Sequence, residues 1–332
     1  MTDLVEEIRS AAKGLGKVKL MEVCGGHTNT VMKYGIRGIL PENVKLVSGP
    51  GCPVCVTSQR DIDSIIELAL NGVKIATYGD MVRVPGTKKS LQDARAEGAD
   101  VQIVYSVDEI KDRERVFFGI GFETTTPMTA KLLKDGFTVF SSHKTMPNAM
   151  IALSKEMRID GFISPGHVSA ITGSDTWNEM NLGVPQVICG FNPEMVMRAI
   201  LLLLEQIRNG KSEVLNDYKE VVFPKGNIAA QKIVSETMKP AESEWRGIGI
   251  IPNSGMNPKN EELDARIKFE NDLKNIKSAE HNGCRCGEVI RGLIEPKECA
   301  LFGKACTPEK PKGACMVSEA EGACAIAYRW DK

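Results

Sequence analysis

The chain has 332 residues, enough for two or three domains of about 100–200 residues each. Hydrophobic residues make up 42% of the sequence and charged residues 26%, which is ordinary for a globular protein. The net charge of −1 gives no reason to expect nucleic acid or an anionic membrane as a partner.

The sequence shows no targeting or membrane segment. Its first residues, Met1 to Glu7, are acidic and amphipathic and lack the apolar core of a signal sequence. The longest aliphatic stretch, Ala199 to Leu204, is far shorter than the roughly 20 residues that span a bilayer. We therefore expect a cytoplasmic protein, in which closely spaced cysteines more often bind metals or act in redox chemistry than form structural disulfides.

From Val18 to Asn209, short apolar runs alternate with helical patterns. Several runs are nearly continuous in Val, Ile and Phe, the pattern of strands buried on both faces. The predicted strands are Val18–Val23, Lys45–Ser48, Val73–Thr77, Val101–Tyr105, Val116–Ile120, Thr138–Ser141, Gly161–Ser164 and Gln186–Cys189. The predicted helices are Arg60–Leu70, Leu91–Glu97, Thr129–Leu133, Ala149–Met157 and Pro193–Arg208.

This alternation predicts an α/β fold with parallel, doubly wound sheets. Eight strands suit two related α/β domains, with a cleft between them, better than one. A capping box at Ser106 and Glu109 predicts a short helix near the divide. We therefore expect domains at residues 1–108 and 109–212, followed by a Cys-rich C-terminal domain at residues 213–332.

The C-terminal part differs in composition from the rest of the chain. Glu261–Lys274 has the pattern of a charged amphipathic helix, and Asn253–Pro258 that of a turn cluster. From Gly283 onward, Gly, Pro and Cys interrupt short segments that could hardly build a core alone. Such a segment needs a metal or a covalent link to become ordered.

Two cysteine-containing loops follow predicted strands directly. Cys24 and His27 lie in the first loop, and Cys52 and Cys55 in the second, each with several glycines. In a doubly wound sheet both loops leave the carboxyl ends of strands, where ligands bind. Each loop also leads into a helix N-terminus, which lowers the pKa of a thiol, so we expect reactive thiolates.

The spacing of these four residues fits three kinds of site. Cys24-x2-His27 with Cys52-x2-Cys55 resembles a structural zinc site. Cys52-x2-Cys55 alone resembles a dithiol–disulfide motif. The third is an open, thiolate-rich site for a transition metal that arrives and leaves. Two Gly-rich loops in a cleft favour this last interpretation, although spacing does not identify the metal.

Six of the ten cysteines lie between residues 284 and 324, namely Cys284, Cys286, Cys299, Cys306, Cys315 and Cys324. A 4Fe–4S cluster takes four thiolates, which leaves two for a neighbouring disulfide or dithiol. The spacing lacks paired CxxC knuckles, which disfavours a zinc ribbon, and it does not decide which four bind. In an extended Cys284-x-Cys286 both side chains lie on one face, so one could ligate and the other pair with a nearby thiol.

Other polar residues follow predicted strands. Glu123 lies in a Gly121–Thr126 turn that could bind a polar ligand or simply start a helix. His143 and His167 each end a strand, a place where histidine is more often structural. Cys189 ends an apolar run and is expected to be a buried, inert thiol.

Six segments together resemble the HypD family, whose members are maturation factors for nickel–iron hydrogenases. They are Glu22–Thr28, Gly49–Cys55, Gly121–Thr125, Pro165–Ser169, Cys284–Glu288, and Cys306–Pro308 with Gly313–Ser318. The resemblance implies two related α/β domains and a third that carries a 4Fe–4S cluster. It implies that Cys284, Cys299, Cys306 and Cys324 bind the cluster.

The resemblance also implies a functional role for the remaining thiols. Cys286 and Cys315 would be a redox-active pair, and Cys52 with Cys55 a second dithiol reached by thiol exchange. Cys24, Cys52 and Cys55 would hold the iron of an Fe(CN)2CO precursor, with His27 as a further ligand or hydrogen-bond donor. The implied partners are HypC, a small protein with an N-terminal cysteine, and HypE, which supplies cyanide; the hydrogenase large subunit is reached indirectly.

The sequence thus predicts a cytoplasmic scaffold and redox protein for iron-cofactor assembly. The alternative is an iron–sulfur-dependent disulfide reductase that acts on protein substrates. A third hypothesis, a zinc-stabilised interaction module, predicts a colourless protein.

Overall fold

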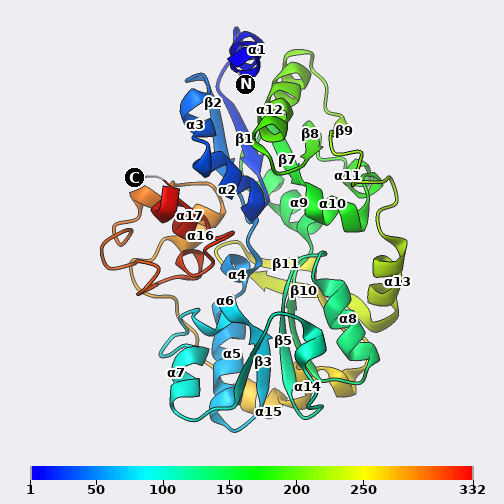
Figure 1. The fold of residues 1–332 in the computed structure, drawn as a ribbon, viewed down its shortest axis with the longest axis vertical. Helices are drawn as coiled ribbons and strands as arrows, with labels where there is room; N and C mark the ends of the chain where they lie inside the picture. The colour runs from blue at the N-terminus through cyan, green and yellow to red at the C-terminus, as the bar shows by residue number, and fades with distance from the viewer. Residues whose placement is uncertain (1, 331–332) are drawn as a thin grey trace.

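The chain folds around two parallel β-sheets, with a Cys-rich segment beside the region where they meet (Figure 1). The computed structural model describes residues 2–330. The first sheet has the order β2-β1-β7-β8-β9, and all neighbouring strands are parallel. Its strands are β1 (Val18–Glu22), β2 (Val44–Ser48), β7 (Gly161–Pro165), β8 (Gln186–Cys189) and β9 (Val214–Asn216).

The second sheet has the order β4-β3-β5-β6 and is also parallel. Its strands are β3 (Ile75–Tyr78), β4 (Val101–Val104), β5 (Val116–Gly121) and β6 (Val139–His143). The predicted α/β class and all eight predicted strands are confirmed, because these strands are largely buried and so carry continuous apolar runs. Strand β9 escaped prediction because its three residues are only half-buried.

The two sheets are interleaved along the sequence. After β1 and β2 the chain crosses to the second sheet, builds all four of its strands, and returns to the first sheet with β7. The expected division after residue 108 therefore falls inside the second sheet, between β4 and β5. Parallel neighbours are joined by crossover segments, so adjacent strands such as β1 and β7 need not be close in sequence.

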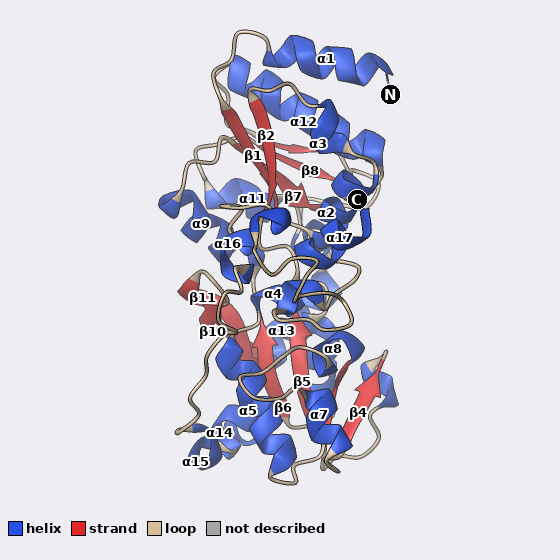
Figure 2. Cartoon of the chain, turned by 90° about the vertical axis from the view of Figure 1, so that its left-hand side faces the viewer, coloured by secondary structure: helices blue, strands red, loops and turns tan. Residues whose placement is uncertain are grey.

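Helices cover both faces of the first sheet (Figure 2). Ile163 packs under α1 (Thr2–Ala12) and α12 (Pro193–Arg208), whereas its neighbour Phe162 belongs to the core that includes α9 (Met146–Glu156). This alternation is the two-residue period of a strand buried on both sides. No helix within residues 2–330 is both long and apolar enough to cross a membrane.

The five predicted helices are all present, with small shifts of their ends. They are α5 (Gln59–Leu70), α7 (Leu91–Ala96), α8 (Thr126–Lys134), α9 and α12, and the predicted capping box starts η1 (Val107–Glu109). The remaining helices of this part are α2 (Gly25–Lys33), α3 (Ile36–Ile39), α4 (Pro53–Val56), α6 (Gly79–Val82), α10 (Gly166–Thr172), α11 (Asp175–Met180) and α13 (Ile228–Thr237).

Two expectations for the C-terminal part were wrong. The segment Asn253–Pro258 is not a turn but part of β11 (Gly249–Pro258), which pairs antiparallel with β10 (Met238–Trp245). The expected helix at residues 261–274 is broken into η2 (Glu261–Leu263), α14 (Ala265–Lys268) and α15 (Glu270–Leu273). Asp264 ends the first piece and caps the next, accepting a hydrogen bond from Arg266 N, which interrupts a continuous helix.

The Cys-rich segment contains little regular structure beyond α16 (Cys286–Ile290), η3 (Pro296–Glu298), η4 (Ala314–Met316) and α17 (Ala323–Trp330). It is held against the first-sheet half of the molecule by an ion pair of Arg37 with Glu295. Arg83, from the second-sheet half, donates a hydrogen bond to Pro308 O. The segment therefore bridges the two halves (Figures 1 and 2).

Candidate functional site

Each sheet has a point where its strand order reverses direction, and ligands of doubly wound proteins bind outside such points. In the first sheet the point lies between β1 and β7, and Cys24 follows β1 directly. In the second it lies between β3 and β5, and α4, which carries Cys55, packs on β5. The Cys24 and Cys52 loops are joined where Gly25 N donates a hydrogen bond to Gly51 O (3.1 Å).

Cys24 is the N-cap residue of α2 and is buried. The second loop passes so close to it that a Cβ on Gly51 would lie 2.4 Å from Cys24 N. Gly25 is just as confined, because a Cβ there would lie 2.3 Å from Cβ of Glu321 in the C-terminal segment. The glycines therefore permit three segments, distant in sequence, to meet at Cys24.

A buried carboxyl group lies directly behind Cys24. Glu22, at the end of β1, is fully buried; its carboxyl accepts hydrogen bonds from Cys24 N (3.1 Å) and Thr28 Oγ1 (2.5 Å). Burial raises the pKa of Glu22 to about 7, although these hydrogen bonds oppose the shift. Glu22 was not among the predicted site residues; the available signal was an acidic residue at the end of a strand predicted to be buried.

Burial disfavours the expected thiolate form of Cys24 and Cys55. Burial, with a smaller contribution from the Glu321 carboxylate, raises the pKa of Cys24 to about 12. Burial also raises the pKa of Cys55 well above its ordinary value. The helix N-terminus behind Cys55 belongs to a helix of only four residues, and desolvation outweighs its effect.

His27 turns toward Cys189 rather than toward the second loop. Its Nε2–H donates to Gly190 O (3.0 Å) and lies 3.5 Å from Cys189 Sγ, while its buried Nδ1 has no hydrogen-bond partner. Burial lowers the pKa of His27 to about 4, so the imidazole is neutral at neutral pH. Cys189 is fully buried, as expected.

The other strand-end residues have separate environments. His143 is buried and bonded to Thr129 Oγ1 (2.7 Å) and Thr126 Oγ1 (3.3 Å), which makes it a satisfied structural histidine. His167 is exposed and stacks on Phe191, 3.9 Å between ring centres. Glu123 starts the turn into α8, and its Oε1 accepts a hydrogen bond from Met146 N at the start of α9 (2.9 Å).

The Cys52 and Cys55 thiols face each other and the C-terminal segment. Cys52 Sγ accepts a hydrogen bond from Cys55 N (3.2 Å), because Cys52 is the N-cap residue of α4. The Cys55 thiol in turn lies beside that of Cys315, where α4 packs on η4. Two cysteines that are 260 positions apart in sequence (55 to 315) are therefore in direct contact.

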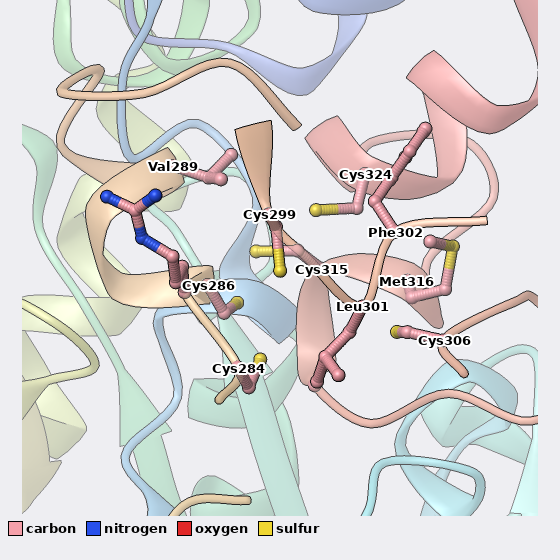
Figure 3. A pocket seen from close by; sticks show the side chains of 12 residues that line it. Cys284, Cys286, Val289, Cys299, Leu301, Phe302, Cys306, Cys315, Met316 and Cys324 are labelled. Atoms are coloured by element: carbon pink, nitrogen blue, oxygen red, sulfur yellow. The ribbon is translucent and has the colours of Figure 1, made fainter. Parts of the chain in front are cut away.

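All six C-terminal cysteines line one cavity with apolar neighbours (Figure 3). Cys315 is the most central of them, since its thiol lies close to those of Cys286, Cys324 and Cys55. The Cys286 thiol also lies close to that of Cys284, and both are free. A Cβ on Gly313 would lie 2.5 Å from Cys284 Sγ, so this glycine gives the thiols room. The thiols thus form a continuous chain from Cys52 through Cys55 and Cys315 to the cavity.

The cavity suits an iron–sulfur cluster in its donor chemistry. Its walls combine six thiols with apolar side chains, including Val289, Leu301, Phe302 and Met316, and Figure 3 shows the sulfur atoms directed inward. Soft thiolates in an apolar pocket are the ligands such a cluster requires. The donors present therefore fit this cofactor.

The four residues predicted to form a site in the two cysteine loops lie near one another without converging on one point. They are Cys24, His27, Cys52 and Cys55. Within residues 2–330, no three His, Cys, Asp or Glu side chains converge closely enough to hold a single metal ion. A 4Fe–4S cluster has four iron atoms and spreads its ligands around it, so this observation bears on Cys24, His27, Cys52 and Cys55 rather than on the cavity. A single iron atom bound at these residues would require the two loops to move.

The comparisons with known proteins agree over the whole chain. The family model HypD, described as the hydrogenase formation hypA family, matches residues 1–331. The hydrogenase maturation factor HypD of Azotobacter vinelandii is 41% identical, over 99% of this chain and 93% of its own length. That of Cupriavidus necator is 40% identical, over 99% and 94%. A protein of Methanocaldococcus jannaschii named for hydrogenase expression and formation is 42% identical, over 98% and 96%.

Proposed function

This chain belongs to the HypD family of hydrogenase formation proteins, and from that premise we propose that it is a scaffold and redox protein for assembling the Fe(CN)2CO group of nickel–iron hydrogenases. The observation that carries the proposal is the contact between the Cys55 and Cys315 thiols. This contact links the Cys-rich cavity, which suits a cluster, to the Cys52 loop, which lies against Cys24.

The iron is the cargo in this proposal. Cys24, Cys52 and Cys55 provide soft thiolate ligands, and His27 provides a neutral imidazole as a further ligand or hydrogen-bond donor. A cysteine from a HypC-like small partner completes the ligand set, and a HypE-like partner supplies cyanide. The finished group passes through the small partner to the hydrogenase large subunit. We place this chemistry in the cytoplasm, where thiols stay reduced.

In this proposal the C-terminal cysteines deliver electrons to the site. Cys284, Cys299, Cys306 and Cys324 would hold a 4Fe–4S cluster, which supplies electrons one at a time when bound. The Cys286/Cys315 dithiol then reduces a Cys52–Cys55 disulfide by two thiol exchanges.

Each exchange keeps the number of disulfide bonds constant. Cys315 Sγ first attacks Cys55 Sγ, which breaks the Cys52–Cys55 bond; Cys52 leaves as a thiolate and takes up a proton. Cys286 Sγ then attacks Cys315 Sγ, which releases Cys55 in the same way. Two electrons and two protons have then moved from one dithiol to the other, and Cys286–Cys315 is the new disulfide.

An infrared and visible spectrum tests the proposed function. The protein is purified without oxygen together with its small partner and the other maturation proteins. We expect cluster absorption in the visible range and infrared bands of bound cyanide and carbonyl, where protein does not absorb. Cys24→Ala should lose the infrared bands and keep the cluster, because Cys24 lies outside the cavity. Full maturation activity of this variant would contradict the assembly site.

The same thiol chain also suits a second function, an iron–sulfur-dependent disulfide reductase of protein substrates. The observation that favours it is again the contact of Cys55 with Cys315, because an external disulfide could take the place of Cys52–Cys55. Cluster absorption with no cyanide or carbonyl bands, even with all maturation partners present, would support this alternative. A colourless protein with stoichiometric zinc would contradict both.

A further inference from the structure

The tip of the β10–β11 hairpin is hydrogen-bonded to the chain immediately after Cys55. Arg246 N donates a hydrogen bond to Val56 O (2.9 Å), and Arg246 Nε donates to Thr57 O (3.1 Å). The guanidinium also donates from Nη1 to Gln59 Oε1 (3.0 Å). Arg246 is thus hydrogen-bonded to the last residue of α4, to the residue after it and to the first residue of α5.

The other side of the same tip packs against Gly287, the residue after Cys286. A Cβ on Gly287 would lie 2.7 Å from Gly247 Cα, and a Cβ on Gly247 only 2.2 Å from Gly287 Cα. The two backbones are therefore in contact, and any side chain at either position would separate them. The hairpin tip is a spacer between the Cys55 segment and the Cys286 segment.

Arg246 is buried at this position although its guanidinium is incompletely paired. Its side chain is 3% exposed, and its Nη2 is buried without a hydrogen-bond partner. Its Nη1 forms an ion pair with Glu280 Oε1 (3.2 Å), a partly exposed carboxylate. Burying a guanidinium that is incompletely paired costs free energy, so a role in packing alone explains it poorly.

We propose that the hairpin tip sets the distance between Cys55 and the Cys286/Cys315 dithiol, with Arg246 as its positioning residue. This inference rests on the proposed exchange between the two dithiols. Such exchange depends on close alignment of the reacting sulfur atoms, and a misplacement of about 1 Å can slow a reaction on the order of 100-fold. Arg246 suits the task because its planar fork holds two acceptors in fixed directions, which a lysine cannot do.

The test measures how readily Cys55 and Cys315 join. In full-length, cluster-containing Cys52→Ser/Cys286→Ser protein, the remaining partners are free to form a stable Cys55–Cys315 disulfide. Equilibration against reduced and oxidised glutathione gives the effective concentration of one thiol at the other. We expect Arg246→Ala to lower this value about 10–100-fold and Arg246→Lys to restore little of it.

A second variant approaches the same contact from the opposite side. Gly287→Ala should lower the effective concentration similarly, because its Cβ meets backbone. Gly38→Ala, where a Cβ meets nothing within 4 Å, is the matched control and should have no effect. This pair keeps the inference testable if Arg246→Ala does not fold.

A second readout separates positioning from general damage. The reduction potential of Cys286/Cys315, measured in a Cys52→Ser/Cys55→Ser background, should stay unchanged in Arg246→Lys, which keeps the positive charge that acts on Cys286. An effective concentration within about twofold of the parent in both Arg246→Ala and Gly287→Ala would overturn the inference while leaving the exchange intact. If the parent protein itself forms no Cys55–Cys315 disulfide, the proposed exchange fails whatever Arg246 does.

Discussion

At the scale of single residues, burial decides the chemistry more than sequence context does. The Gly-rich loops and helix N-termini around Cys24 and Cys55 predicted thiolates, yet burial raises the pKa of both thiols. A helix N-terminus is visible in a sequence, whereas the segments that cover it are not. The places of Glu22 and Glu321 next to Cys24 could not be predicted for the same reason, because they depend on contacts across the fold.

Glu123 gives a pH-dependent prediction at this scale. Burial raises its pKa to about 7 from an ordinary 4.5, and its buried Oε2 has no hydrogen-bond partner. Between these values the folded state binds more protons than the unfolded state, so this group makes stability fall as pH rises. Glu123→Gln should therefore gain stability relative to the parent between pH 4.5 and about 7, by up to about 3 kcal/mol.

Denaturant unfolding at several pH values measures this difference. Comparison with the parent is essential because buried His27 and His143, whose pKa values burial lowers to about 4, produce the opposite slope in an overlapping range. Glu220→Gln, at an exposed carboxyl, is the control and should track the parent. A stability difference for Glu123→Gln that is constant with pH would contradict this account.

At the scale of elements, the strands were predictable where they are buried on both faces. β5 and β6 carry continuous apolar runs, and their prediction needed no tertiary information. β10 and β11 alternate irregularly between exposed and buried residues, and Pro240 lies within β10, so neither showed a strand pattern. The element that we propose as the spacer between the dithiols was for this reason invisible in the sequence.

A prediction for elements concerns the contact of α2 with the C-terminal segment. Gly25→Ala would place its Cβ 2.6 Å from Glu321 Cα, which is backbone and cannot turn away. We expect the segment to separate locally and Cys24 to react with iodoacetamide about tenfold faster, equivalent to about 1.4 kcal/mol of lost contact. Peptide mass spectrometry of the alkylated protein measures the rate.

The neighbouring glycine supplies the control. A Cβ on Gly26 would meet the ring edge of Phe191, at 2.9 Å, and make ordinary contact with Cys24 Sγ, at 3.7 Å; both are side-chain atoms, and a side chain can shift. Gly26→Ala should therefore change the Cys24 rate much less. Equal rates in the two variants would show that the contact with Glu321 does not protect Cys24.

At the scale of the whole molecule, the strand list predicted the fold class but not the sheet membership. The first sheet combines strands that precede and follow the stretch of chain that builds the second, and no local pattern records which strands become neighbours. The result is that the Cys24 loop lies at the reversal point of the first sheet and α4, with Cys55, packs on β5 at that of the second, while the C-terminal segment bridges the two halves. Arg37 with Glu295 and Arg83 with Pro308 fix that bridge, and it brings Cys315 to Cys55.

The most direct test of this account is to trap the exchange between the two dithiols. Cluster-containing Cys52→Ser/Cys286→Ser protein, mildly oxidised, lacks both thiols that could resolve the mixed disulfide, Cys286 in the forward direction and Cys52 in reverse. After alkylation and digestion, mass spectrometry should find the Cys55 peptide linked to the Cys315 peptide as the main disulfide, and Cys315→Ser should show no such link. Cys55 and Cys315 that both remain free thiols in this oxidised double variant would contradict the proposed path.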